Sequence, residues 1–331
     1  MSNQQIHTSV QESQPLVSFI ITYHNQPMQM LQECIGSILQ LSLRSFEREI
    51  LVIDDGSDVS PVNQLMNQDE DVTYLRQKHS GLSAARNKGI DVATGRYLQF
   101  VDADDRLIPA SYELCLDIVR YQEDVDMVMF DFSTTSQVEA IPETVLPVIG
   151  SAYMRNNNIH GSACGYLFRK SILGELRFTP CIFHEDEEFT PQLLLRAESV
   201  YPTHHKAYFY FQHEGTITAN QDTENVNKRL DDQMGVLLRL HALCDKLPHQ
   251  DKMALERRIA QLTMDYIYNT IMMTRKQDVL ERKIHELYAQ GLFPLPDADY
   301  SRKYTWFRRL TNSRMGRTIL LHTLPLLKKE R

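Results

Sequence analysis

Residues 81–105 read GLSAARNKGIDVATGRYLQFVDADD, and this stretch gives the clearest prediction of the fold in the chain. Leu82–Ala93 lies between two glycines and carries mostly helix-forming residues, which is typical of a short helix. Tyr97–Val101 is an apolar and aromatic run of the kind found in buried strands, and it ends in the acidic run Asp102–Asp105. A helix followed directly by a buried strand is half of a βαβ unit with parallel strands.

The same alternation continues on both sides of this stretch. We expect further strands at Val17–Thr22, Glu49–Ile53, Val72–Leu75 and Val125–Phe130, and helices at Met28–Leu41 and Ser111–Val119. Alternating elements of this kind predict an α/β fold with a mostly parallel central sheet flanked by helices. In such sheets the ligand binds outside the carboxyl ends of the strands.

The alternation weakens beyond about Ser133. Two further strands are expected at Cys164–Phe168 and Ala207–Phe211, with an acidic run between them that starts at His184. After about Gln221 the apolar spacing is helical, and it predicts helices at Asn225–Leu243, Gln250–Met273 and Gln277–Tyr288. We therefore expect a helical C-terminal extension on the α/β domain.

Composition limits the class of protein. The 331 residues are 42% hydrophobic and 24% charged, enough for a sizeable core, and their five cysteines are scattered without a CxxC pair. Residues 1–15 are polar and predict a flexible leader without the pattern of a signal peptide. No apolar run is long enough to span a membrane. These features predict reduced thiols and a cytoplasmic protein.

The charge is unevenly distributed. The whole chain carries −8, which speaks against nucleic acid as a partner, yet residues 301–331 hold nine Lys or Arg and one acidic residue, giving +8. The remaining 300 residues therefore carry −16. This basic tail also contains apolar residues, so we expect either a packed helix with a solvated basic face or peripheral attachment to an anionic membrane surface. The sequence does not predict an oligomeric state.

Polar side chains follow three of the expected strands. They are Thr22 to Asn25, Asp54 to Ser57, and Asp102 to Asp105. Because the carboxyl ends of parallel strands meet at one edge, these side chains are expected to gather there. Asp102 and Asp104 form a DxD pair, and two carboxylates at this spacing suit Mg²⁺ or Mn²⁺ on a diphosphate. Alone, an acidic turn that caps the next helix is the commoner explanation.

Other residues allow both a functional and a plain structural interpretation. Asp55 can accept a hydrogen bond from a nucleobase or belong to an ordinary turn, and Arg86 can pair with a phosphate or be solvated. In the acidic run, Glu185 and Asp186 can supply a general base or simply begin a helix. His213 can ligate a metal or meet a phosphate, although a lone histidine more often does neither. GxGxxG, P-loop, HExxH and GxSxG motifs are absent at convincing positions.

Taken in order, four motifs resemble those of the family 2 glycosyltransferases, which have the GT-A fold. They are VSFIITYHN (17–25), EILVIDDGSD (49–58), GLSAARNKGIDVATGRYLQFVDADD (81–105) and HEDEEF (184–189). The resemblance covers roughly residues 16–220. It implies a Rossmann-like sheet and an inverting enzyme that moves a sugar from a nucleotide-diphosphate sugar, UDP by family habit, to a hydroxyl of a glycan or lipid-linked glycan.

The resemblance also implies roles for individual residues. Thr22, His24, Asn25 and Asp55 would contact the nucleoside, although many members have Pro and Tyr where this chain has Thr22 and His24. Arg86 would face the diphosphate, Asp102 the ribose, and Asp104 the metal, a divalent Mn²⁺ or Mg²⁺, with Asp102 and His213 as further candidate ligands. Asp186 would be the catalytic base, supported by Glu185.

The resemblance divides the chain into 1–15, a catalytic domain at 16–220 and a helical region at 221–331. Within the catalytic domain, 16–132 would bind the nucleotide sugar and 133–220 the acceptor. A role in bacterial surface polysaccharide synthesis is the first hypothesis. The alternatives are an inactive glycosyltransferase-like scaffold and a nucleotidyltransferase, and the latter lacks a basic phosphate-gripping loop after the first strand.

Overall fold

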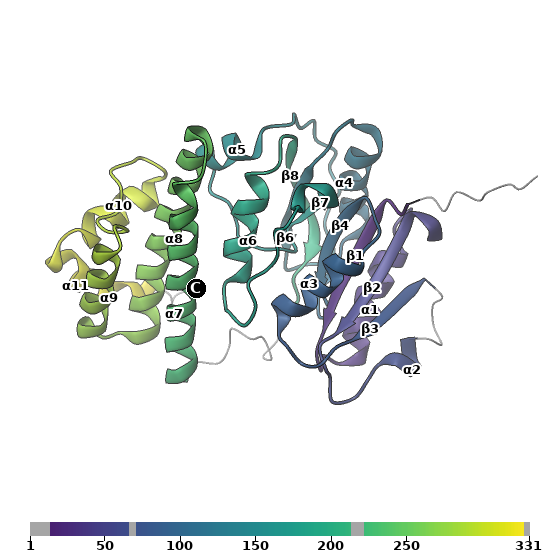
Figure 1. Ribbon diagram of the computed structural model, residues 1–331, viewed down its shortest axis with the longest axis horizontal. Coiled ribbons are helices and arrows are strands. Elements are labelled where there is room, and N and C mark those ends of the chain that lie inside the picture. The colour runs from purple at the N-terminus through teal and green to yellow at the C-terminus, as the bar shows by residue number, and fades with distance from the viewer. Residues whose placement is uncertain (1–13, 66–70, 213–221, 328–331) are drawn as a thin grey trace, which may run out of the picture.

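The structure is a computed structural model that describes residues 14–65, 71–212 and 222–327. Its centre is an eight-stranded sheet with strand order β3-β2-β1-β4-β7-β6-β8-β5. In Figure 1 the sheet occupies the right half of the molecule, and the C-terminal helices stand beside it on the left. An α/β sheet flanked by helices, followed by a helical extension, confirms the predicted fold class.

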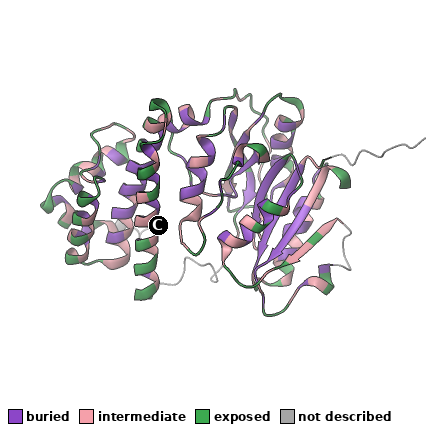
Figure 2. Ribbon diagram, viewed as in Figure 1, coloured by how far each residue is buried: buried purple, intermediate pink, exposed green. Residues whose placement is uncertain are grey.

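The first four strands in the order are parallel. The elements of this half are β1 (Val17–Tyr23), α1 (Met28–Leu39), β2 (Arg48–Asp54), α2 (Val62–Leu65), β3 (Val72–Arg76), α3 (Leu82–Val92) and β4 (Tyr97–Asp102), with a 3₁₀ turn at Ser45–Glu47. Every residue of β1 is buried, because the strand lies between two neighbours and is covered on both faces. Figure 2 shows β1, β2 and β4 as mostly buried, whereas β3 at the edge of the sheet is partly exposed.

The second half of the sheet is mixed, with β6 parallel to β8 and the other pairs antiparallel. Its elements are β5 (Arg106–Leu107), α4 (Pro109–Tyr121), β6 (Met127–Ser133), α5 (Gly150–Asn156), β7 (Tyr166–Arg169), α6 (Glu185–Leu194) and β8 (Val200–Phe209), with a 3₁₀ turn at Lys170–Leu173. β7 is antiparallel to both β4 and β6, and β5 is antiparallel to β8. An apolar run predicts a buried strand but not its direction, which depends on the connection.

The strand expected at Ala207–Phe211 lies instead at Val200–Phe209. Its middle alternates between buried and exposed side chains, with Thr203 and His205 buried and His204 and Lys206 exposed. Because polar residues occupy both faces of this middle part, the apolar residues of the sequence predict only the C-terminal end of β8.

Five helices follow the sheet. They are α7 (Thr223–Cys244), α8 (His249–Thr274), α9 (Gln277–Ala289), α10 (Arg302–Thr311) and α11 (Arg314–Leu327). These helices share one hydrophobic cluster, and the sheet with its covering helices forms another. α8 reaches both, because its Ala254 packs in the sheet cluster while Leu255 packs among the helices. Across the described residues, no helical segment has the length and hydropathy needed to traverse a bilayer.

Two glycines inside helices provide a matched test of the packing between α3 and the sheet. A Cβ on Gly89 of α3 would overlap the Ile20 side chain of β1, whereas a Cβ on Gly36 of α1 would meet no atom within 4 Å. We expect Gly89→Ala to lower the free energy of unfolding by about 1–3 kcal/mol through overpacking. Gly36→Ala should raise it by about 0.5–1 kcal/mol, because alanine favours the helix.

Urea denaturation of both variants measures this difference. Equal stability of the two variants would contradict the close approach of α3 to β1.

Candidate active site

The polar edge of the sheet forms where β1, β2 and β4 end side by side. Thr22 pairs in register with Ile53 of β2 and with Asp102 of β4. The backbone N–H of Asp55 donates to the carbonyl of Tyr23 at 2.9 Å, which joins the first two loops. The three polar clusters that follow these strands therefore lie along one edge.

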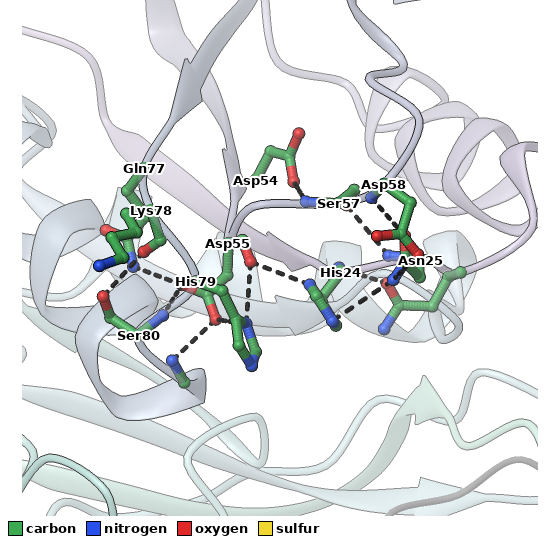
Figure 3. Close-up of polar contacts among 12 residues, drawn as sticks. His24, Asn25, Asp54, Asp55, Ser57, Asp58, Gln77, Lys78, His79 and Ser80 are labelled. Atoms are coloured by element: carbon green, nitrogen blue, oxygen red, sulfur yellow. Dashed lines mark hydrogen bonds and ion pairs between the residues drawn. The ribbon is translucent and has the colours of Figure 1, made fainter.

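Asp55 organises the loop that leads into α3 (Figure 3). Its carboxylate is nearly buried and accepts hydrogen bonds from Gln77 Nε2 at 2.7 Å and from the backbone N–H groups of Ser80 and Gly81 at 2.8 Å each. His79 Nδ1 lies 2.8 Å from its Oδ2. Since a carboxylate offers about four acceptor sites, this one is saturated by its own loop. A nucleobase that bound here would have to displace one of these donors.

Gly56 allows this close approach. It has φ of 73°, and a Cβ at this position would lie 2.6 Å from the backbone nitrogen of His79. Only glycine takes up that backbone conformation readily and leaves the space open. The DDGS turn thus needs its glycine for the contact between two loops.

His24 and His79 form a stacked pair above Asp55, with ring centroids 4.3 Å apart and planes at 22°. Both Nδ1 atoms lie beside the backbone carbonyl of Asp55, at 2.9 and 3.0 Å. A carbonyl only accepts, so we assign each ring a proton on Nδ1. Sequence analysis missed His79, because the contact depends on folding of the loop and no motif there includes a histidine.

One ligand atom from each of His24, Asp55 and His79 fits within a 4.8 Å cluster, close enough for a metal site. Imidazole with a carboxylate is a donor set that suits transition metals. With Nδ1 protonated and directed at a carbonyl, each ring keeps a lone pair on Nε2, the nitrogen that a metal-ligating histidine commonly uses in this arrangement. The cluster is therefore a possible metal site, and its Asp55 carboxylate also holds the loop through two backbone N–H groups.

Asn25 connects the first loop to the second, as Figure 3 shows. Its amide oxygen accepts from the backbone N–H of Asp58 at 2.8 Å, its amide nitrogen donates to the Asp58 carboxylate at 3.2 Å, and its own N–H donates to Ser57 Oγ at 3.0 Å. Its φ is 62°, a left-handed conformation that asparagine tolerates better than most residues. The described contacts of Asn25 therefore brace the loops.

Arg86 joins the sheet edge to the acidic run. It is 3% exposed, and its guanidinium donates to Asp102 Oδ1 at 3.2 Å and to Glu185 Oε1 at 2.9 Å. The rings of Phe100 and Phe178 flank it, with centroids 5.9 and 5.4 Å from Cζ. Burial alone would lower the pKa of Arg86, but the neighbouring carboxylates outweigh it and hold the pKa above its ordinary value. Arg86 is therefore a permanent cation at the centre of the site.

Asp186 stands in the first turn of α6 beside Glu185. Burial and the negative charge of Glu185 raise the pKa of Asp186 to about 7, with Arg86 acting in the opposite direction. A carboxyl group with a pKa near neutrality can exchange a proton with a substrate hydroxyl. The structure thus brings both acidic residues predicted for catalysis to the same place as Arg86 and Asp102.

Helices of the C-terminal region hold α6 in position. Arg239 of α7 donates both Nε and Nη2 to the carboxylate of Glu188, at 2.7 and 2.8 Å, and Arg258 of α8 pairs with Glu187. The backbone N–H of Phe183, just before α6, donates to Asp232 of α7 at 2.9 Å. Sequence analysis did not identify these partners, because ion pairs between residues more than 45 positions apart leave no local pattern.

The DxD turn lies between β4 and β5 and gathers three carboxyl groups. Asp105 is buried and accepts from Tyr208 Oη at 2.9 Å and from the backbone N–H of Phe211 at 2.8 Å. Burial, followed by the charges of Asp102 and Asp104, raises the pKa of Asp105 to about 8. His213, the remaining predicted ligand, lies outside the described residues and stays a prediction.

A parallel sheet edge with a DxD turn, a buried arginine and an acidic helix start is the arrangement expected of a nucleotide-sugar transferase, and comparison with known proteins agrees. Residues 18–177 match the family described as Glycosyl transferase family 2. The chain belongs to this family and is a glycosyltransferase.

Relatives and solved structures support this class. YibD of Escherichia coli K12, described as an uncharacterized glycosyltransferase, is 25% identical over 271 residues, which are 74% of this chain and 77% of that protein. TarS of S. aureus in complex with UDP-GlcNAc has a TM-score of 0.60 at 16% identity, covering 89% of this chain and 92% of that one. The mannosyltransferase PcManGT of Pyrobaculum calidifontis in complex with GDP-Man and Mn²⁺ has a TM-score of 0.55 at 14% identity, covering 93% and 87%.

Substitution of Asp55 separates a structural role from base recognition. Asp55→Asn should lower the free energy of unfolding of the ligand-free protein by about 1.5–3 kcal/mol. The substitution replaces one carboxylate oxygen, which accepts from backbone N–H groups, with an amide NH₂ group that cannot accept. Asp58→Asn, at an exposed aspartate in the same turn, serves as the control and should change it by less than about 0.5 kcal/mol. Chemical denaturation checks both values. Unaltered stability in Asp55→Asn would contradict its role in the loop.

Proposed function

We propose that the protein transfers a sugar from a nucleotide-diphosphate sugar to a hydroxyl group of a glycan or lipid-linked glycan, with inversion at the anomeric carbon. The observation that carries this proposal is the position of Arg86, which contacts Asp102 at the end of β4 and Glu185 at the start of α6. The arginine therefore links the edge suited to a nucleotide with the helix that carries the candidate base. We propose residues 16–220 as the catalytic domain and 221–331 as a region that supports it.

The donor would lie along the sheet edge. Thr22 and the stacked His24–His79 pair would meet the nucleobase, because both lie at this edge and imidazole faces can stack on any base. Asp102 is partly exposed and can take the ribose, and its partner Arg86 would face the diphosphate. TarS was solved with UDP-GlcNAc and PcManGT with GDP-Man, so the fold accommodates either base. We propose a UDP-sugar as the donor.

The residues of the DxD turn fit a divalent cation. Their donor set is all carboxylate, which suits Mg²⁺ or Mn²⁺. Asp104, with Asp102, would hold the ion, which when bound stabilises the negative charge of the leaving diphosphate. PcManGT was solved with Mn²⁺, which supports this assignment.

The acceptor would approach from the α6 side. Asp186 in its deprotonated form would take the proton of the attacking hydroxyl, and a single in-line displacement would invert the anomeric configuration. Glu185 raises the pKa of Asp186 and also holds Arg86, so it couples the base to the donor side. Arg86 adds a fixed positive charge where the leaving group becomes negative.

Nucleotide binding is the first test of the donor site. Calorimetry with UDP, GDP and dTDP, each with and without Mn²⁺, should show metal-dependent binding of one nucleotide, and Asp104→Ala should abolish its metal dependence. Asp117→Ala serves as the matched control, because Asp117 is a half-exposed aspartate on α4 away from the turn. Failure of all three nucleotides to bind would contradict the donor site and favour an inactive scaffold.

The acid limb of the pH profile tests the base. Asp186 is active only when deprotonated, so a pKa raised toward neutrality predicts that the rate falls as the pH drops below about 7. Glu185→Gln removes the charge that raises this pKa and should shift the acid limb to lower pH. Asp186→Asn should reduce the rate by about 10²–10⁴-fold with nucleotide binding retained.

The readout is release of the nucleoside diphosphate from the donor identified by calorimetry. If Glu185→Gln leaves the acid limb in place, or if Asp186→Asn retains full activity, Asp186 is not the base.

A further inference from the structure

We propose that the outer surface of α10 and α11 docks onto an anionic lipid bilayer. These two helices lie at the opposite end of the molecule from strands β1 to β3 (Figure 1). Their inner side packs in the cluster of C-terminal helices through Tyr304, Phe307 and Leu320. Figure 2 shows that this end of the molecule also presents exposed turns of helix. The chemistry of those exposed residues identifies the partner.

The first feature is unpaired positive charge. Residues 302–327 contain six Lys or Arg and no Asp or Glu. Two of the six have structural roles, because Arg308 pairs with Asp297 and Arg317 with Glu281. Arg302, Arg309 and Arg314 are exposed, and within residues 14–65, 71–212 and 222–327 they form no ion pair. Asp299 stands beside Arg302 and Arg309, and Glu281 is near Arg314, yet α10 and α11 themselves carry only positive charges, which favours an anionic partner.

The second feature is a tryptophan between two of these arginines. Trp306 is 50% exposed, and Arg302 and Arg309 lie about one helical turn before and after it. The three line a shallow cavity of about 400 Å³ together with Asp299, Ser301 and Thr305. An indole ring with flanking guanidinium groups matches the boundary between lipid headgroups and acyl chains, where tryptophan is enriched and arginine meets phosphate.

The third feature is an apolar stripe on the outside of α11. Met315, Ile319 and Leu326 are 76%, 45% and 64% exposed, and their spacing of four and seven residues places them on one face of the helix. Leu320 and Leu321 on the other side already fill the packing against the neighbouring helices. The outer stripe is therefore free of contacts that would explain its apolar character within the described fold.

Together these features favour a bilayer over a second copy of the chain. In a two-fold dimer the same patch would face itself, and three unpaired arginines on each side would repel one another. A membrane surface offers both phosphate charge and an apolar layer. α11 has 14 residues, a length of about 21 Å. It would therefore lie along the surface in the manner of an interfacial helix.

Vesicle binding tests the proposal with the full chain. We expect cosedimentation with vesicles of phosphatidylcholine and phosphatidylglycerol in equal parts, but not with phosphatidylcholine alone. Arg302→Gln/Arg309→Gln should weaken binding about 25-fold, since each charge near the membrane surface contributes about fivefold. Binding should also fall as salt is raised. Trp306→Ala should weaken binding in both low and high salt.

A matched control removes two charges elsewhere. Lys246→Gln/Lys276→Gln neutralises two exposed lysines of the helical region outside α10 and α11 and should leave vesicle binding unchanged. Circular dichroism of each variant verifies that it is folded.

Four outcomes would overturn the proposal. They are no binding to the anionic vesicles, equal binding to phosphatidylcholine, an equal loss in the lysine control, and self-association through the same arginines without vesicle binding. None of them bears on the donor site.

Discussion

The structure depends on how one buried guanidinium is satisfied. A buried charge is strongly unfavourable unless it is paired, and removal of one partner of a buried pair typically costs about 3–5 kcal/mol. Arg86 meets this requirement through Asp102 on β4 and Glu185 on α6, residues that lie 83 positions apart in the chain. Because Arg86 needs both partners, the start of α6 must lie against this edge of the sheet. The same constraint fixes the position of Asp186. The ion pairs of Arg86 therefore stabilise the fold and also bring the residues of the candidate site together.

Placement of α6 requires more than Arg86, and the C-terminal helices supply the rest. Glu187 and Glu188 follow Asp186 directly and are paired with Arg258 of α8 and Arg239 of α7. Four acidic residues in one helical turn would repel one another if left alone, although the helix dipole favours them. Three arginines from three different elements remove that repulsion and leave Asp186 as the member of the run with a raised pKa. The helical region thus contributes to the electrostatics of the site without lining it.

The sequence allows prediction of features that are local and fails where pairing is distant. β1, β2 and β4 could be predicted because they are continuous apolar runs, and Asp102 and Asp55 because they follow such strands. β5 was not predicted because it has only two residues. Most of β8 was not predicted because the exposed His204 and Lys206 interrupt its apolar pattern. In the site, family resemblance implied separate roles for Arg86 and Glu185, and their contact is seen only in the structure. The saturation of the Asp55 carboxylate by residues 77–81 has no signal in the sequence at all, because it depends on the path of a loop.

The balance of charge around Arg86 explains why the site needs a further cation in the proposed function. Asp102, Glu185 and Asp186 lie around one buried arginine, and Asp104 and Asp105 follow Asp102 in the turn, so carboxyl groups outnumber this cation. A diphosphate brought to this edge would meet net repulsion. A divalent cation on the DxD turn would reverse the sign of the electrostatic potential next to Asp105. Asp186 would keep Glu185 as its negatively charged neighbour. In the proposed function the turn with its cation would attract the donor, and the start of α6 would keep Asp186, with a pKa of about 7, ready to act as the base.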